Sequence, residues 1–218
     1  MKLKLRNLCN LDFEIMASIM LISLFLLVAV QVVDSLSIMK DTKGKFSSYR
    51  ITKLKDFFDV FDVDEDGVLT EHEYVVLTTE RAQNVLLSWR AMAVNGIFSN
   101  AFRVWWSNKY SNYKTAFTFK DMIRVHEIDL PISTEELAEG SWDLFGTFDI
   151  DCDGKLAIDE YSKFLFVFRN TAEIQPIFDA IDQNANGVLD AEEFVSAYDL
   201  HWYRQEFSTT DVIIGKRY

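Results

Sequence analysis

Cysteine, proline and glycine are all scarce in this sequence of 218 residues, which contains 2 Cys, 2 Pro and 8 Gly. Cys9 lies near the N-terminus and Cys152 in the body of the chain, so a chain processed between them has no pair for an internal disulfide. So little Pro and Gly argues against turn-rich β folds and disordered chains. The 49% hydrophobic content and the 18 Phe favour a helical domain with an aromatic core.

Positive charge is also in short supply, with 22 basic residues against 34 acidic ones and a net charge of −12. Nucleic-acid binding needs clustered Lys and Arg, so the sequence predicts no nucleic-acid partner. Cations are the natural counter-charge instead. The sequence has no nucleophile–base set, no phosphate-binding loop and no zinc spacing, and the prediction is that the chain is not an enzyme.

One long apolar run stands apart from this composition. Ile15–Val33 is a stretch of nineteen uncharged residues that follows a basic N-terminus. Small residues after it suit a signal peptide, residues 1–37, cleaved near Ser35 or Ser37, which predicts the secretory pathway, secreted or luminal. The run is just long enough to cross a bilayer, so an uncleaved membrane anchor is the alternative. A start at Met16 would give a more compact signal sequence.

A twelve-residue pattern occurs three times, at 62–73, 149–160 and 182–193. Asp, then Asp or Asn at alternate positions, leads to a Gly at position 6 and a Glu at position 12. A hard cation of calcium's size takes six to eight oxygens, and this spacing supplies them from positions 1, 3, 5, 7 and 12. Glycine at position 6 permits the sharp turn. The pattern predicts three sites for calcium ions (Ca²⁺).

The predicted ligands differ slightly among the three loops. Position 9 is Thr70 in the first loop, but Ala157 in the second, where water is expected to fill the vertex. The third loop replaces two carboxylates by amides and regains one at position 9. The ligands are Asp62, Asp64, Asp66, the Val68 carbonyl and Glu73; Asp149, Asp151, Asp153, the Lys155 carbonyl and Glu160; and Asp182, Asn184, Asn186, the Val188 carbonyl, Asp190 and Glu193.

Apolar residues at helical spacing precede each loop, as in the helix–loop–helix unit of EF-hand proteins, which this pattern resembles. Position 8 is Leu69, Leu156 or Leu189, the apolar residue that forms a short strand between neighbouring EF-hand loops. The predicted fold class is all-α, with four EF-hand units in two pairs forming one compact body. The predicted domains after the leader are 38–130 and 131–218, the latter with a C-terminal tail.

The intervals between the loops leave room for the fourth unit. The second and third loops begin 33 residues apart, whereas the first and second begin 87 apart. EF-hands usually come in pairs, so residues 83–127 are predicted to form a degenerate second hand. If Phe117 is position 8 of that hand, a cation stands where calcium needs an anion, and no metal is predicted there. Its positions 1, 3, 5 and 6 are then Tyr110, Asn112, Lys114 and Thr115.

The loop order and spacing over residues 48–215 resemble the sarcoplasmic calcium-binding protein superfamily, which includes coelenterate photoproteins and luciferin-binding proteins. That resemblance implies an aromatic-rich interior, which in photoproteins holds coelenterazine. Two family histidines correspond to Leu54 and Tyr198 here, whereas the tryptophan after the last loop is kept as Trp202. These replacements disagree with light emission, and Trp105, Trp106 and Trp202 are predicted to be core residues.

The remaining functional classes are a calcium buffer or store and a calcium sensor that opens a groove for a partner protein. Sensors expose Met-rich surfaces. Beyond the leader this chain has only Met39, Met92 and Met122. The composition therefore favours the buffer, and it identifies no protein partner.

Overall fold

The computed structural model describes residues 46–127, 134–203, 206, 213 and 214, with the backbone alone at 134–138 and 203. The leader or anchor predicted at 1–37, with its apolar run Ile15–Val33, lies outside these residues. Within the described part, no helix combines the length and the apolar character needed to cross a bilayer.

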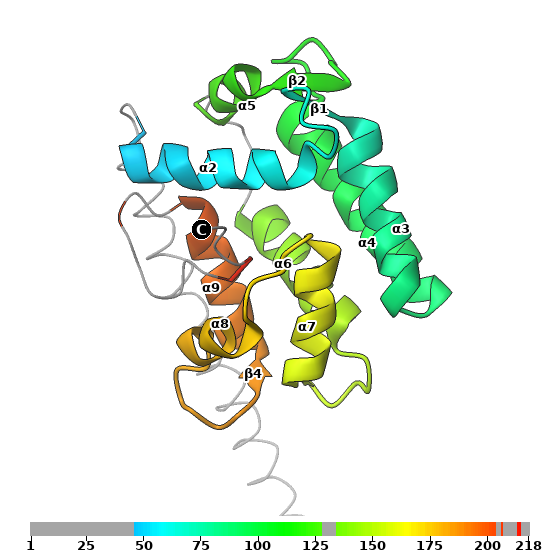
Figure 1. Cartoon of the computed structure of the whole chain (residues 1–218), viewed down its shortest axis with the longest axis vertical. Coiled ribbons are helices and arrows are strands. Elements are labelled where there is room, and N and C mark those ends of the chain that lie inside the picture. Colours follow the sequence, from blue (N-terminus) through cyan, green and yellow to red (C-terminus); the bar gives the residue numbers. More distant parts are fainter. Residues whose placement is uncertain (1–45, 128–133, 204–205, 207–212, 215–218) are drawn as a thin grey trace, which may run out of the picture. The chain divides into compact units, whose positions relative to one another are not determined.

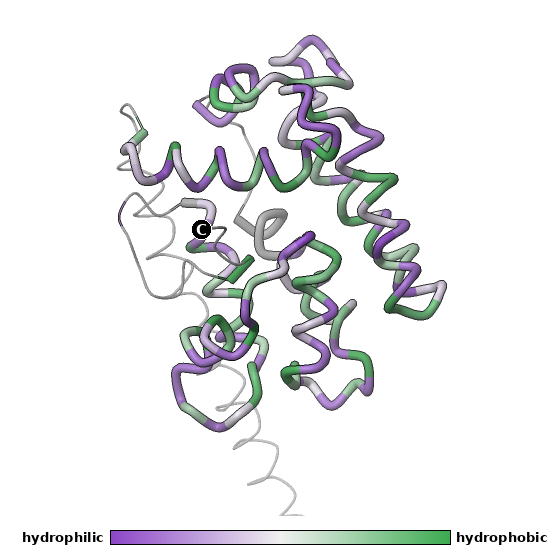
Figure 2. Tube along the Cα trace, in the orientation of Figure 1, coloured by the Kyte–Doolittle hydropathy of each residue, from purple (hydrophilic) through white to green (hydrophobic). Residues whose placement is uncertain are grey.

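The first half of the chain begins with a capped helix. Helix α2 (Ser48–Phe61) starts after Ser47, whose hydroxyl accepts a hydrogen bond from the Arg50 N–H at 3.1 Å. Hydrophilic and hydrophobic residues alternate along α2, so one face can be buried (Figure 2). The elements of this half are α2 (Ser48–Phe61), β1 (Val68–Thr70), η1 (His72–Val76), α3 (Leu77–Val85), α4 (Ser88–Ala101), η2 (Phe102–Trp106), β2 (Ala116–Thr118) and α5 (Phe119–His126) (Figure 1).

The second half repeats this arrangement. Each of its calcium-type loops follows a helix whose last residue, Phe148 or Ile181, is fully buried. Phe61, the last residue of α2, is buried in the same way. Its elements are α6 (Thr134–Phe148), β3 (Lys155–Leu156), α7 (Ile158–Val167), α8 (Ile174–Ile181), β4 (Leu189–Asp190) and α9 (Ala191–Tyr203).

Two short antiparallel ladders join the loops in pairs. Leu69 of β1 lies opposite Phe117 of β2, and Leu156 of β3 lies opposite Leu189 of β4. All four side chains are buried, so each ladder fixes its register by placing an apolar pair in the core. The prediction that Phe117 marks position 8 of a hidden second hand is confirmed, and with it the all-α fold of four hands in two pairs.

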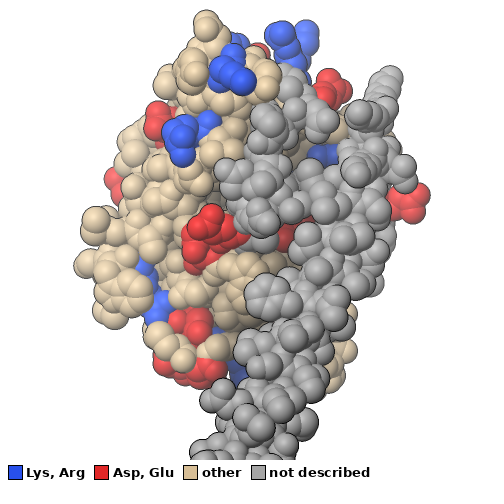
Figure 3. Space-filling view, turned by 180° about the vertical axis from the view of Figure 1, so that it is seen from behind, with Lys and Arg blue, Asp and Glu red and all other residues tan. Residues whose placement is uncertain are grey.

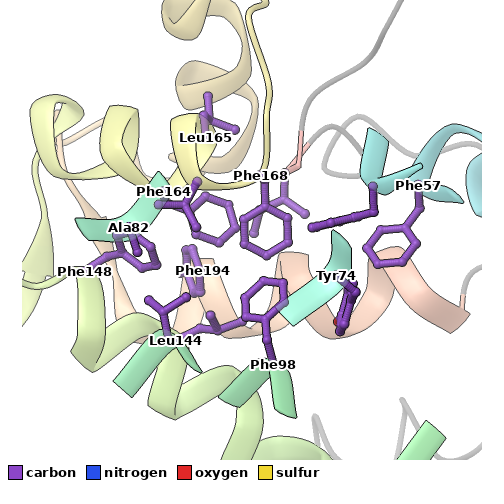
Figure 4. Close-up of a cluster of buried hydrophobic side chains, with 14 of the residues drawn as sticks. Phe57, Tyr74, Ala82, Phe98, Leu144, Phe148, Phe164, Leu165, Phe168 and Phe194 are labelled. Carbon is purple, nitrogen blue, oxygen red and sulfur yellow. The ribbon is translucent and has the colours of Figure 1, made fainter. Parts of the chain in front are cut away.

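Aromatic side chains from both halves form one core (Figure 4). Phe168, at the end of α7, lies 5.9 Å from Phe61 and 5.4 Å from Phe98, measured between ring centroids. Its ring also lies 4.5 Å from Phe164 in its own half. Because Phe168 is 1% exposed and contacts aromatic rings of both pairs, the pairs share a single core.

Truncation of Phe168 should therefore destabilise the whole body. Phe168→Ala is expected to lower the free energy of unfolding by about 3–5 kcal/mol, because it leaves a cavity where the halves meet. Phe166→Ala is the matched control: Phe166 is 45% exposed, and its truncation should cost less than about 1 kcal/mol. Urea unfolding followed by circular dichroism measures both. Equal losses from the two variants would contradict the shared core.

Candidate metal centre

Three carboxylates gather in the first loop. One oxygen from each of Asp62, Asp64 and Asp66 lies within 4.8 Å of the others. Asp62 is buried; its Oδ2 accepts a hydrogen bond from the Gly67 N–H at 3.0 Å, whereas its Oδ1 has no hydrogen-bond partner. A buried carboxylate oxygen without a donor is costly, and a cation is the group that satisfies it. The donor set therefore fits calcium.

The position-12 glutamate closes this loop. Glu73 Oε1 accepts a hydrogen bond from the Val63 N–H at 2.8 Å, and Oε2 accepts from the N–H and hydroxyl of Thr70 at 2.9 and 2.7 Å. Burial of Glu73 favours its protonated form, but these hydrogen bonds outweigh burial and lower its pKa. The pKa of Asp62 is raised, first by burial and then by the neighbouring negative charges. A cation among these carboxylates would offset the repulsion that contributes to the raised pKa of Asp62.

The second calcium-type loop repeats the arrangement. The carboxylates of Asp149, Asp151 and Asp153 again lie within 4.8 Å of one another. Glu160 accepts hydrogen bonds from the N–H groups of Ile150 and Ala157 at 2.7 and 2.9 Å, and Asp149 accepts from the Gly154 N–H at 3.0 Å. Residue Ala157 thus contributes only its backbone, as the sequence predicts.

The third loop keeps the same hydrogen bonds with amides in place of two carboxylates. Glu193 accepts from the N–H groups of Gln183 and Asp190 at 3.0 and 3.1 Å. Asp182 Oδ2 accepts from the Gly187 N–H at 2.8 Å. The loop glycines have φ of +82°, +80° and +82° in chain order, a conformation that favours glycine, so this turn is common to all three loops.

Every predicted ligand residue lies in one of these three loops. The position-7 residues, which offer only carbonyls, stand at the loop–strand junction: Val68 begins β1, Lys155 begins β3 and Val188 precedes β4. Asn184, Asn186 and Asp190 occupy positions 3, 5 and 9 of the third loop. The assignment of these residues as ligands remains a prediction from spacing that the loop geometry fits.

The degenerate loop contains an ion pair that was not predicted from the sequence. The ammonium of Lys114, at position 5, lies 3.0 Å from the carboxylate of Asp121, at position 12. The hydrogen bond from Lys114 is the largest of the effects that lower the pKa of Asp121. Counting from Phe117 as position 8 would have found Asp121. Lys114 thus neutralises the carboxylate that this loop retains at a ligand position.

Two arginines cross between the halves and hold the helices that lead into calcium-type loops. Arg90 of α4 is 2% exposed and donates hydrogen bonds to the carbonyls of Gly146, Thr147 and Ile150 at 2.8, 2.9 and 3.1 Å. These carbonyls surround the junction of α6 with the second calcium-type loop. A guanidinium there satisfies helix-end acceptors that lack an intrahelical donor.

The reverse connection comes from the second half. Arg169, the second residue after α7, donates a hydrogen bond to the Val60 carbonyl at 2.7 Å, in the last turn of α2. Each half therefore supplies a cation to the helix that enters a loop of the other half. The sequence gives no local signal for either contact, because the partners are far apart along the chain.

A cavity of about 1110 Å³ lies beside the aromatic core. Trp105, Trp106 and Trp202 line it, so the prediction that these tryptophans are simply core residues is incomplete, although they also pack in the core. The Nε1–H of Trp106 donates to His126 Nε2 at 3.2 Å, and burial lowers the pKa of His126 to about 3. Burial raises the pKa of Asp199, also in the lining, to about 6.

Comparison with known proteins supports the calcium-type assignment. A family model described as EF hand matches residues 54–77 and 174–196. Calretinin of Rattus norvegicus and of Mus musculus is 27% identical over an alignment of 156 residues, which covers 65% of this chain. The chain spans 56% of the length of these curated relatives.

Solved structures share the fold at low sequence identity. The sarcoplasmic calcium-binding protein from amphioxus is 14% identical, with a TM-score of 0.57 over 79% of this chain and 100% of that one. The coelenterazine-binding protein from Renilla muelleri is 18% identical, with a TM-score of 0.54 over 78% and 97%. Okadaic acid binding protein 2.1 is 17% identical, with a TM-score of 0.63 over 79% and 98%.

The family match, the paired loops and the shared fold lead to one conclusion. The chain contains EF-hand units and has the fold of sarcoplasmic calcium-binding proteins and photoproteins.

Proposed function

We propose that the chain is a calcium buffer or store with three active EF-hands, the first, third and fourth. The observation that carries this proposal is the common hydrogen-bond pattern of the three loops. In each loop the glutamate at position 12 accepts hydrogen bonds from backbone N–H groups at positions 2 and 9 of the loop. These hydrogen bonds position the carboxylate without help from a bound ion. Oxygen ligands held in this way favour a hard cation, and binding then stabilises the folded state.

The crossed arginines favour a buffer over a sensor. A sensor responds to calcium by reorienting its helices and exposing a groove. Here Arg90 and Arg169 bind the ends of α6 and α2 to the opposite half, and Phe168 joins both halves in one core. Opening either pair would break these contacts.

We place the chain in the secretory pathway on the strength of the apolar run Ile15–Val33 and the small residues after it. If the leader is removed, the protein meets calcium near millimolar concentration outside the cell or in a luminal store. Sites as tight as those of intracellular buffers would then remain filled and act structurally. Retention of the run as a membrane anchor is the alternative, and sequencing the mature N-terminus distinguishes the two.

Calorimetric titration tests the number of active hands. The chain is expected to bind about three calcium ions, and Glu73→Gln, Glu160→Gln or Glu193→Gln should each reduce this to about two, because an amide cannot supply both oxygens of a bidentate carboxylate. Glu71→Gln, an exposed change within the first loop, is the control and should leave about three. A wild-type chain that binds one calcium ion or none would contradict the proposal.

Removal of the Lys114 ammonium tests whether the second hand binds no calcium. Lys114→Ala is expected to leave the calcium stoichiometry at about three, because Tyr110 and Asn112 still occupy positions 1 and 3. The loss in stability should be less than about 1 kcal/mol, since the Lys114–Asp121 pair is largely solvent-exposed. The same titration and a urea melt measure both effects. A fourth calcium ion in the variant would mean that Lys114 alone blocks the site.

The cavity supports a second candidate function, the binding of a bulky aromatic ligand. Its volume suits a small organic molecule, and its lining combines aromatic rings with a few polar groups, among them His126, Ser141 and Asp199. Two proteins of the same fold are named for the organic compounds that they bind, coelenterazine and okadaic acid. In the present chain, a bulky aromatic ligand would occupy this cavity.

Filling the cavity tests this second candidate. Coelenterazine is expected to quench the tryptophan fluorescence of the wild-type chain, because Trp105, Trp106 and Trp202 line the cavity. Gly140 also lines it, and Gly140→Leu should weaken binding at least about tenfold by occupying the space, whereas Gly140→Ala should not. Calcium is expected to trigger no light, since Leu54 and Tyr198 replace the family histidines. Quenching that Gly140→Leu leaves unchanged would place the ligand elsewhere.

A further inference from the structure

Charge is distributed very unevenly between the two halves. Residues 46–127 contain 11 acidic and 10 basic residues, whereas residues 134–203 contain 16 acidic and 3 basic residues. Within the first half, Arg81–Lys120 contains six basic residues and no acidic one. An even distribution would place about six acidic residues in that segment. The excess negative charge therefore lies in the second half, whereas the first half is close to neutral and its silent second hand is rich in basic residues.

The cations of this hand face solvent. Arg103 of η2, Lys109 of the loop, and Lys120 and Arg124 of α5 are all exposed. Across the described residues, none of the four forms an ion pair. Lys120 and Arg124 are four residues apart and share one face of α5. Figure 3 shows Lys and Arg side chains gathered at the upper end of the molecule, the end that carries α5 and β2 in Figure 1.

Two tyrosines accompany these cations on the silent loop. Tyr113 is 67% exposed and Tyr110 is 41% exposed. Asn112 and Tyr113 adopt φ of +58° and +55°, a left-handed conformation uncommon for tyrosine, and the Tyr113 N–H donates to the Asn108 carbonyl at 2.9 Å. The turn therefore holds an amphipathic ring out in solvent. Tyrosine beside lysine is typical of protein surfaces at the membrane–water interface.

The charge distribution distinguishes between anionic partners. A membrane is a flat surface that touches one end of the molecule, so the strongly acidic second half can point away from it. A long nucleic acid could also use lysines and stacked tyrosines, but it would extend toward the acidic half and be repelled there. The exposed basic side chains lie on a turn and on one face of α5, an arrangement that can contact a flat membrane surface.

We propose that the second hand, silent for calcium, is a docking surface for anionic phospholipid membranes. Lys109, Lys120 and Arg124 contact the lipid phosphates and carboxylates, while Tyr110 and Tyr113 lie at the level of the headgroups. The docking needs no calcium, because the loop of the silent hand already carries its own cation in Lys114. This role is independent of ion buffering by the other three hands.

Vesicle co-sedimentation of the full chain tests the proposal. In chelator and near-physiological salt, the chain should bind vesicles containing phosphatidylserine more tightly than vesicles of phosphatidylcholine alone, and high salt should remove the difference. The matched variants described next separate this effect from binding through Ile15–Val33 and its basic N-terminal flank, because those variants leave that segment unchanged.

Matched variants locate the surface. Lys109→Glu should weaken binding to phosphatidylserine vesicles at least about fivefold, whereas Lys163→Glu, the same charge change in the acidic half, should weaken it less than about twofold. Tyr113→Ser should weaken it several-fold without altering the net charge. Circular dichroism and calcium stoichiometry verify that each variant is folded, and they report on the buffer proposal separately.

Four results would overturn the assignment. One is equal binding to both kinds of vesicle, and another is binding that requires calcium. A third is an equal loss from Lys109→Glu and Lys163→Glu, because that would reflect net charge alone. Tighter binding of single-stranded DNA than of phosphatidylserine vesicles, weakened by Lys109→Glu, would also overturn it and make the surface a nucleic-acid site.

Discussion

The glutamate at position 12 determines the geometry of each calcium-type hand. Its carboxylate accepts N–H groups from the first turn of the loop and from the start of the exit helix, so one side chain joins both ends of the motif. This contact fixes where the exit helix begins and therefore where its apolar face lies. The paired strands and the shared aromatic core follow from that placement.

In the silent hand, Asp121 takes the place of the position-12 glutamate, and the ammonium of Lys114 supplies the positive charge. Asp121 accepts hydrogen bonds from the N–H and hydroxyl of Thr118 at 3.2 and 2.9 Å, as Glu73 does from Thr70 in the partner loop. The ammonium of Lys114 supplies positive charge from within the chain. The hand thereby keeps its strand opposite β1, and its partner keeps a complete pair.

Local spacing and long-range contacts differ in how much the sequence reveals. The loops follow a fixed pattern, so the positions of their predicted ligands and the register of Leu69 against Phe117 could be derived from spacing alone. Asp121 could also have been predicted as position 12 of the silent hand, by counting from Phe117 as position 8. Arg90 could not be predicted, because its carbonyl partners lie more than fifty residues away and any arginine of suitable reach satisfies them. The cavity depends on how all the helices pack, which no local pattern encodes.

The crossed arginines also bear on how such a chain can evolve. Exchanging one pair of hands for that of another protein would remove the donor that the remaining pair needs at the end of its entering helix. The carbonyls of Val60 or of Gly146 and Thr147 would then lose their guanidinium partners. The halves resemble each other as repeats, yet each supplies a donor that the other needs, so they are not interchangeable modules.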